Sequence, residues 1–300
     1  MTPRLKAHLA VLTANLFFGI NFSVMKYVTG SLMTPLALNA LRVTGSMILF
    51  WTFVLLRPVP LRIEKKHRLR LIICTLTGIV INQVLFTKGV SLTTPIHGAL
   101  LMLVCPIAVV FIAAALIGEG IHLKKMAGLA LGVSGAVLLI LLRENTPGAP
   151  DVLTGDLLIM ANALSYAFYM VLVQPMMKSY NGIALLTWMF SLSVLILLPA
   201  GWNDCTKINW GAFMLNDWLA LFFVIAAVTF GAYLMNIYSI RHLGPSVTGA
   251  YIYTQPFFAG VISVLYAGDT QHLWIKLLAA VLIMTGVYLV SQKRTGTVSE

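Results

Sequence analysis

Polar side chains stand at helical spacing inside several long apolar stretches of this 300-residue chain. Residues three apart share one face of a helix, so each such pair predicts a local hydrogen-bonding surface. The pairs are Asn39 with Arg42, Tyr166 with Tyr169, and Tyr233 with Asn236. Guanidinium, amide and phenol groups can hold a small polar molecule, but here they do not combine a nucleophile with a general base. We therefore expect binding rather than catalysis at these positions.

Further polar residues lie singly in the same apolar stretches. Polar groups are costly in hydrocarbon, so they usually face the interior of a helical bundle. The additional candidates for ligand contact are Asn15, Asn21, Gln83, Tyr253 and Gln255. The same side chains can instead link neighbouring helices by hydrogen bonds, and the sequence leaves both interpretations open.

Arg42 is the most informative candidate because it carries a charge. It lies about seven residues inside its apolar stretch, roughly 10 Å deep at 1.5 Å per residue. All nine acidic residues fall in connecting segments or at the ends of apolar stretches, so the sequence offers this guanidinium no obvious partner. Two roles stay open: Arg42 binds an anionic group of a ligand, or it caps carbonyls freed by a kinked helix.

The position of the acids also bears on energy coupling. Proton-coupled carriers commonly place Asp or Glu near the middle of the membrane, where burial raises the pKa of the carboxyl group. No apolar stretch of this chain has that feature. The sequence therefore favours facilitated diffusion or exchange over obligatory coupling to protons.

Other kinds of chemistry have little support. The sequence has no glycine-rich phosphate loop with its lysine, and "GLALG" at 128–132 has the spacing of a close helix–helix contact. Cys74, Cys105 and Cys205 lack C-x-x-C spacing and the six histidines are scattered, so we expect no metal site and no cofactor. The net charge of +11 is not arranged in basic patches interleaved with aromatic residues, so we expect no nucleic-acid binding.

The elements that must position these residues are membrane helices. The chain is 59% hydrophobic and only 10% charged, with a mean hydropathy of +0.92, whereas soluble domains carry about 25% charged residues. Continuous runs of about 20 apolar residues suit helices that cross roughly 30 Å of hydrocarbon, not the alternating strands of a barrel. We predict an all-α integral membrane protein with ten transmembrane helices, near 8–28, 35–56, 69–90, 97–118, 123–142, 156–177, 183–201, 217–240, 246–267 and 272–291.

The distribution of lysine and arginine predicts the orientation of these helices. With the amino terminus inside, fourteen of the 20 basic residues lie on the inner side, six of them within 57–70. An even number of spans returns the carboxyl terminus to the same side, so both termini are predicted to be cytoplasmic. The segment 57–70 serves as a topology anchor or as a site for an anionic lipid. Lys26 and Lys88 lie near outer span ends, and we expect both to extend toward lipid headgroups.

An offset of 150 residues relates the two halves of the chain. It links Pro95 with Pro245, Pro106 with Pro256, Glu119 with Asp269, and His122 with His272. Five predicted spans separate each residue from its copy, so the copy crosses the membrane in the opposite direction. We predict two inverted five-helix repeats, 8–142 and 156–291, an arrangement that supports alternating access. Pro106 and Pro256 should kink their helices, either as gating elements or as packing features.

Several motifs resemble those of a known family. They are "GINFSVMKYV" in the first span, "ALNALRVTGSMIL" in the second, a proline followed by an acid at P-x(12)-[ED] in the fourth and ninth, and "GDLL" at 155–158. Over nearly the whole chain this combination resembles the EamA-type family of the drug/metabolite transporter superfamily. The resemblance implies export or exchange of amino acids, other small metabolites or drugs across a bacterial inner membrane, through a cavity between the repeats. Two departures bear on substrate preference: "FFG" where Trp-Gly is usual, and His97 where Asn or a small residue is common.

These features predict a secondary transporter, an exporter or exchanger of small metabolites such as amino acids or organic anions, or of drugs, that works by alternating access. The alternative is a membrane channel or a membrane-embedded enzyme. A channel would not require an inverted repeat with paired kinks, and an enzyme would need converging catalytic groups, which the sequence does not show. The expected partners are a small-molecule substrate and the lipid bilayer. No sequence feature predicts an oligomeric state.

Overall fold

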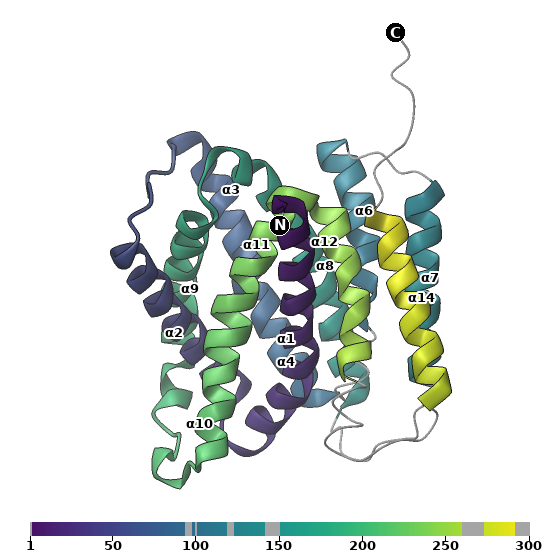
Figure 1. The fold of residues 1–300 in the computed structure, drawn as a ribbon. Coiled ribbons are helices and arrows are strands. Elements are labelled where there is room, and N and C mark those ends of the chain that lie inside the picture. The colour runs from purple at the N-terminus through teal and green to yellow at the C-terminus, as the bar shows by residue number, and fades with distance from the viewer. Residues whose placement is uncertain are drawn as a thin grey trace.

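The computed structural model describes residues 2–93, 98–99, 101–118, 123–141, 151–259 and 273–291 (Figure 1). Every regular element in these ranges is a helix. Six of the described helices are long and apolar enough to cross a membrane: Pro3–Ser31, Pro35–Leu56, Lys65–Leu92, Leu153–Ser179, Gly182–Cys205 and Leu215–Leu243. The predicted all-α class is therefore confirmed.

The elements follow the predicted order along the chain. They are α1 (Pro3–Ser31), α2 (Pro35–Leu56), α3 (Lys65–Thr75), η1 (Leu76–Val80), α4 (Ile81–Leu92), α6 (Val104–Ile117), α7 (Leu123–Leu141), α8 (Val152–Ser179), α9 (Gly182–Cys205), η2 (Trp210–Ala212), α10 (Leu215–Phe222), η3 (Phe223–Ala232), α11 (Tyr233–Leu243), α12 (Pro245–Ala250), η4 (Tyr251–Thr254) and α14 (Leu273–Ser291). Each of the ten predicted ranges contains helix. That all ten cross the membrane as two inverted repeats stays a prediction.

Side-chain caps start several of these helices. Thr2 and Thr34 each accept a hydrogen bond from the backbone N–H three residues on, at 3.3 and 3.2 Å, and a proline occupies the start of the helix that follows. Asp151 and Asn181 cap α8 and α9 in a similar way. Gly244, with a φ of 86°, ends α11 and lets the chain turn into α12.

The helices form a bundle with a pair at each edge (Figure 1). At one edge α2 packs against α9, and at the opposite edge α7 packs against α14. Between them, α1 contacts α4 and α11, while α8 contacts α4 and α6. Segments from both halves of the chain therefore meet in the centre of the bundle.

Glycine allows the close approach of α7 and α14. A β-carbon added at Gly128 would lie 2.7 Å from the Gly286 carbonyl oxygen, and one added at Gly286 would lie 2.6 Å from the Gly128 carbonyl oxygen. Tyr253 packs over Gly132, one turn along α7. The helix–helix contact predicted for 128–132 is confirmed.

Two of the long helical segments contain a stretch of π-helix. The π-helix η1 lies between α3 and α4, and the π-helix η3 lies between α10 and α11. A π segment shifts the backbone hydrogen-bond pattern, so that carbonyls become available to side chains. Tyr233 donates to the Gly78 carbonyl oxygen at 3.0 Å, and Thr229 donates to the Val224 carbonyl oxygen at 2.6 Å. The apolar pattern of the sequence predicts neither π segment.

Pro106 and Pro256 each follow a break in regular α-helix. A proline clashes with the carbonyl four residues before it, which belongs to residue 102 for Pro106 and to residue 252 for Pro256. A turn occupies 102–103, and η4 forms a 3₁₀ helix around residue 252. The interruptions expected from these prolines are present, and their gating role stays a prediction.

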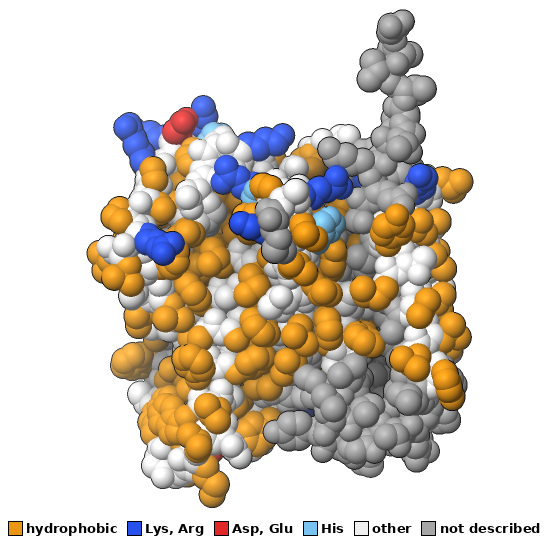
Figure 2. Space-filling model, viewed as in Figure 1, with side chains coloured by type: hydrophobic (Ala, Val, Ile, Leu, Met, Phe, Trp, Pro, Cys, Tyr) orange, Lys and Arg blue, Asp and Glu red, His pale blue; other side chains and the backbone are white. Residues whose placement is uncertain are grey.

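Basic side chains gather at one end of the bundle, where α1 begins (Figure 2). Among the described residues, that end carries Arg4, Lys6, Arg57, Arg62, Lys65, Lys66, Arg68, Arg70, Lys124, Lys125, Lys178 and Arg241, with Glu64 as its acid. The other described acids, Asp151, Asp156, Asp204 and Asp217, lie at the opposite end. This separation of charge agrees with the asymmetry found in the sequence.

Lys26 departs from its expected role. Its Nζ donates to the carbonyl oxygens of Val90, Ser91 and Thr93, at 3.3, 3.0 and 2.8 Å. The last carbonyls of a helix lack partners within that helix and attract cations, so Lys26 caps the end of α4 instead of reaching lipid headgroups. The prediction for Lys26 was wrong, whereas the Lys88 side chain is exposed.

Candidate ligand-binding site

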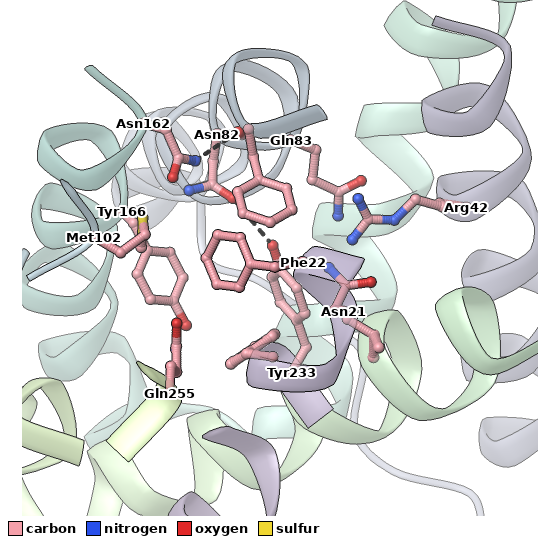
Figure 3. Close-up of a pocket in the computed structure, with 13 residues that line it drawn as sticks. Asn21, Phe22, Arg42, Asn82, Gln83, Met102, Asn162, Tyr166, Tyr233 and Gln255 are labelled. Atoms are coloured by element: carbon pink, nitrogen blue, oxygen red, sulfur yellow. Dashed lines mark hydrogen bonds between the residues drawn. The ribbon is translucent and has the colours of Figure 1, made fainter. Parts of the chain in front are cut away.

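A cavity of about 50 Å³ lies in the centre of the bundle, between helices of both halves of the chain (Figure 3). It has room for a few water molecules but is far smaller than the roughly 300–1,000 Å³ of sites for drug-sized ligands. Its lining consists of Phe18, Asn21, Phe22, Arg42, Asn82, Gln83, Phe86, Met102, Asn162, Tyr166, Val228, Tyr233 and Gln255. In this conformation the site is too small for most organic molecules and must widen to admit them.

Arg42 supplies the charge of the cavity. Its side chain is 3% exposed, and its Nε donates to the Thr229 Oγ1 at 3.1 Å. Thr229 is itself fixed, because its hydroxyl donates to the Val224 carbonyl oxygen. The Arg42 Nη1 is buried and has no hydrogen-bond partner in the described part of the chain. The guanidinium is therefore held along one edge and free to bind along another.

Two amides lie beside this guanidinium in Figure 3. Gln83 is buried with both its Nε2 and its Oε1 unpartnered among the described residues, and the Asn21 Oδ1 is unpartnered there as well. Leaving a buried polar group without a hydrogen bond costs about 1–3 kcal/mol. A cluster of such groups indicates a place for a polar ligand or for ordered water.

The cavity has a polar wall on each side: one consists of Arg42, Gln83 and Asn21, and the other of Asn82, Asn162, Tyr166 and Tyr233. The second wall is already ordered by hydrogen bonds between helices. Asn162 donates from Nδ2 to the Asn82 carbonyl oxygen at 2.7 Å, and Tyr233 lies 3.4 Å from the Asn82 Oδ1 (Figure 3). Asn236, one layer further out, donates to the Tyr166 hydroxyl at 2.5 Å. Among the described buried atoms of this wall, the Asn162 Oδ1 and the Asn236 Oδ1 lack a partner. This wall offers fewer free groups to a ligand than the wall around Arg42.

Aromatic rings occupy the space between the polar walls. Phe22 and Phe86 meet edge to face, with ring centroids 5.2 Å apart, and Phe18 meets Tyr233 in the same way at 6.5 Å. Rings in this position exclude water and contact the carbon skeleton of a ligand. None of the described acids lies in the cavity, so the guanidinium gives the described lining a net positive charge.

The structure brings six of the predicted contact residues to the cavity: Asn21, Arg42, Gln83, Tyr166, Tyr233 and Gln255. The other five lie one layer out and link helices. Asn15 accepts from the Gln255 Nε2 at 2.7 Å, Asn39 accepts from Thr87 at 2.8 Å, and Asn236 bonds to Tyr166. Tyr169 and Tyr253 pack over Gly78 and Gly132.

Some lining residues were not among the predicted contacts. Asn82 and Asn162 carry the same signal as those that were, a polar group inside an apolar span. Phe18, Phe22 and Phe86 carry no such signal, because aromatic residues are ordinary in an apolar span. Among the described residues no group of three or more metal ligands occurs. Pro95, His97, Glu119, His122, Asp269 and His272 lie outside the described residues.

Comparison with known families gives two matches along this chain. The profile of the EamA-like transporter family matches residues 5–141 and again residues 153–292. Together these matches cover most of the chain, and they divide it close to the boundary between the predicted repeats.

Individual proteins are similar over long stretches. An uncharacterized transporter, YyaM of Bacillus subtilis (strain 168), is 22% identical over 294 residues, which is 96% of this chain and 94% of the relative. A "probable terminal-alkyne amino-acid exporter" of Streptantibioticus cattleyicolor is 24% identical over 228 residues, covering 75% of this chain and 73% of that protein.

A solved crystal structure has a similar fold. It matches with a TM-score of 0.73 and 21% sequence identity, over 95% of this chain and 96% of the other. At this identity the likeness concerns the fold alone.

Proposed function

The chain belongs to the EamA-like transporter family, and from this membership we propose that it is a secondary transporter that exports or exchanges small metabolites carrying an anionic group. The observation that carries the proposal is the small central cavity, in which the buried Arg42 guanidinium keeps Nη1 unpartnered among the described residues. A buried cation without an acidic partner is costly, and an anion removes that cost. Amino acids and organic anions are therefore favoured over neutral drugs.

The lining suggests how such a substrate would lie. Its carboxylate would bind the forked guanidinium of Arg42, with Gln83 and Asn21 completing the hydrogen bonds. Phe22 and Phe86 would contact its carbon skeleton, and a second polar group would face Asn162. One relative is named as a probable terminal-alkyne amino-acid exporter, and an amino acid carries a carboxylate.

The structure supports an architecture of ten helices in two inverted repeats. The offset of 150 residues links the break before Pro106 with the break before Pro256, and it places η1 within the range of η3. Helix pairs recur across the bundle as well, since α1 packs against α11 in the way that α8 packs against α4. In inverted-repeat carriers the site lies between the repeats and faces each side in turn. The small volume of the cavity fits an intermediate of that cycle in which the site is contracted.

The basic end of the bundle fits the cytoplasmic side of a bacterial inner membrane. The sequence predicts that both chain termini lie on that side. A carboxyl-terminal fluorescent fusion should glow, while a carboxyl-terminal alkaline phosphatase fusion should be inactive. The reverse pair of results would invert the orientation and contradict this part of the proposal.

The charges of the cavity favour exchange or facilitated diffusion over obligatory proton coupling. None of the described acids lies in its lining, so among those residues it holds no carboxyl group to carry a proton across. Transport into vesicles should persist when no pH gradient is present. Concentrative uptake that depends on an imposed gradient would contradict this.

Counterflow in proteoliposomes tests the proposed function directly. Vesicles loaded with one unlabelled compound are given a labelled trace of the same compound, using a panel of amino acids, carboxylic acids, amines and neutral drugs. We expect transient, saturable accumulation of compounds with a carboxylate and none of the matched amines. Flux that never saturates would indicate a channel, chemical conversion would indicate an enzyme, and exchange of amines alone would overturn the anionic substrate.

A further inference from the structure

A second hollow lies away from the ligand cavity, at the basic end of the bundle. It has a volume of about 280 Å³ and is lined by Lys66, Leu69, Arg70 and Ile73 of α3 and by Leu172 of α8. We call it the α3–α8 groove. The four α3 residues are spaced by three or four positions, so they form one face of that helix. The transport function proposed above makes no use of this groove.

Polar and apolar groups follow one another along the groove in a fixed order. Lys66 and Arg70 lie in the first two turns of α3, at the basic end, and Ile73 lies almost a turn deeper. Leu69 and Ile73 are 68% and 39% exposed, so they offer uncovered apolar surface directly beside two cations. A phospholipid presents the same order, with an anionic phosphate above an acyl chain.

The cations of the groove are only partly neutralised by the protein. Lys66 forms an ion pair with Glu64 at 2.8 Å, in which both side chains are largely exposed. The hydrogen bond from Lys66 holds the pKa of the Glu64 carboxyl below its usual value, so this acid is ionised at neutral pH. Arg70 has no ion-pair partner among the described residues. The groove therefore keeps a net positive charge, which is complementary to a phosphate.

The opposite end of the molecule shows that the repeat itself does not require these cations. The offset of 150 residues takes the four α3 positions to Asn216, Leu219, Ala220 and Phe223. The two apolar positions stay apolar, and both cations are replaced by neutral residues. The two cations are therefore present beside the apolar pair in the first half of the chain and absent at the corresponding positions of the second half.

We propose that the α3–α8 groove is a binding site for an anionic phospholipid of the leaflet at the basic end. The phosphate lies between Lys66 and Arg70, with Arg70 able to hold two of its oxygens. One acyl chain follows Leu69, Ile73 and Leu172 toward the membrane interior. The Lys66 ammonium group contacts both the phosphate and the Glu64 carboxylate.

Lipid titration of the purified full-length protein in detergent tests this site. Binding of phosphatidylglycerol and of phosphatidylcholine with the same acyl chains is measured by native mass spectrometry. We expect phosphatidylglycerol to bind more tightly, and Lys66→Gln with Arg70→Gln to lower its affinity about tenfold or more. Glu64→Gln should raise the affinity, because it removes the competing acid.

The matched control is the double variant Arg57→Gln with Arg62→Gln. It removes the same charge from the same basic region, at exposed positions that do not line the groove. The proposal requires that this control keep its affinity within about twofold and that all variants retain the melting temperature of the parent without lipid. Equal losses in both double variants would show diffuse attraction and overturn the site. Equally tight binding of soluble glycerol phosphate would overturn the lipid as the occupant.

Discussion

The α7–α14 pair and the central cavity show two ways of joining helices within the same molecule. In the pair, glycines at 128 and 286 let two backbones approach closely. Ser134 and Thr285 instead donate to carbonyl oxygens of their own helices, Ala130 and Val281, each at 2.8 Å. The pair is close-packed at these glycines, and none of its described residues lines the ligand cavity.

The centre is joined by polar groups that cross from one helix to another. Tyr233 bonds to the backbone of η1, and Arg42 and Ser46 of α2 both bond to η3, through Thr229 and the Ile225 carbonyl. Lipid gives helices no hydrophobic reason to associate, so contact must come from close packing or from hydrogen bonds. The difference teaches that close packing gives a fixed edge, whereas hydrogen bonds give a centre whose partners a ligand can replace.

The largest effect is expected from a larger side chain in the glycine contact. Gly128→Leu would place a β-carbon 2.7 Å from the Gly286 carbonyl oxygen, and a backbone atom cannot move aside as a side chain can. Overpacking costs about 1–3 kcal/mol or more, which corresponds to a melting temperature lower by roughly 2–12 °C. Fluorescence-detected size exclusion after heating measures this.

Gly30→Leu is the matched control for that change. Gly30 lies on α1, and a β-carbon there would meet nothing within 4 Å. Its melting temperature should therefore stay close to that of the parent. If the two variants were destabilised alike, the α7–α14 contact would not be the cause.

The next largest effect is expected at Arg42. Arg42→Gln should lower the affinity for an anionic substrate about ten- to hundredfold, the equivalent of one charge-assisted hydrogen bond of about 1.5–3 kcal/mol. The affinity of Arg42→Lys should lie between those of the parent and of Arg42→Gln, because lysine keeps the charge but loses the two parallel donors of the guanidinium. Counterflow at varied substrate concentration measures both.

The stability of the Arg42 variants distinguishes a ligand contact from a structural one. Removing a buried charge that has no acidic partner should leave the melting temperature unchanged or raise it. A joint loss of stability and of transport for every substrate would indicate a structural role. Normal transport of an anion by a folded Arg42→Gln variant would end the ligand hypothesis.

A smaller effect is expected at Thr229, which positions Arg42. Thr229→Val keeps the shape and removes the hydroxyl that accepts from the Arg42 Nε. We expect the KM for an anionic substrate to rise about three- to tenfold, the equivalent of one ordinary hydrogen bond. In the Arg42→Gln background the same change should add little, because the two side chains act through one contact.

Thr187→Val is the matched control. Thr187 is as buried as Thr229, and its hydroxyl donates at 2.8 Å to the Ile183 carbonyl of its own helix. Transport by this variant should be unchanged. A rise in KM equal to that of Thr229→Val would show that loss of any buried hydroxyl perturbs the carrier.

The edge of the molecule was more predictable from sequence than its centre. Small residues at helical spacing have one main use in a membrane, so 128–132 indicated its contact correctly. The apolar runs likewise gave the helices, and Asn21, Arg42 and Gln83 were found because polar groups inside such runs face inward. These signals are reliable because lipid leaves each residue type few possible environments in a membrane helix.

The centre was less predictable because its geometry depends on backbone that leaves the regular helix. The π segments have no apolar signature, so the bond from Arg42 to Thr229 and that from Tyr233 to Gly78 could not be anticipated. Lys26 was assigned to the headgroups because the free carbonyls that end α4 become visible only when α1 is placed beside them. Which amides line the cavity and which link helices depends on rotations of less than one helical turn, which spacing alone does not fix.

The smallest effect on transport is expected at Tyr233, which lines the cavity but uses its hydroxyl for a hydrogen bond between helices. Its hydroxyl donates to the Gly78 carbonyl oxygen in η1, so Tyr233→Phe removes a link between helices and leaves the aromatic ring in the cavity wall. Losing one such bond should cost about 1 kcal/mol and lower the melting temperature by roughly 2–4 °C. Substrate affinity should change less than threefold, because the atom removed already has a protein partner. A tenfold loss of affinity with an unchanged melting temperature would place the Tyr233 hydroxyl among the groups that a ligand takes over, and the division between a supporting wall and a binding wall would have to be redrawn.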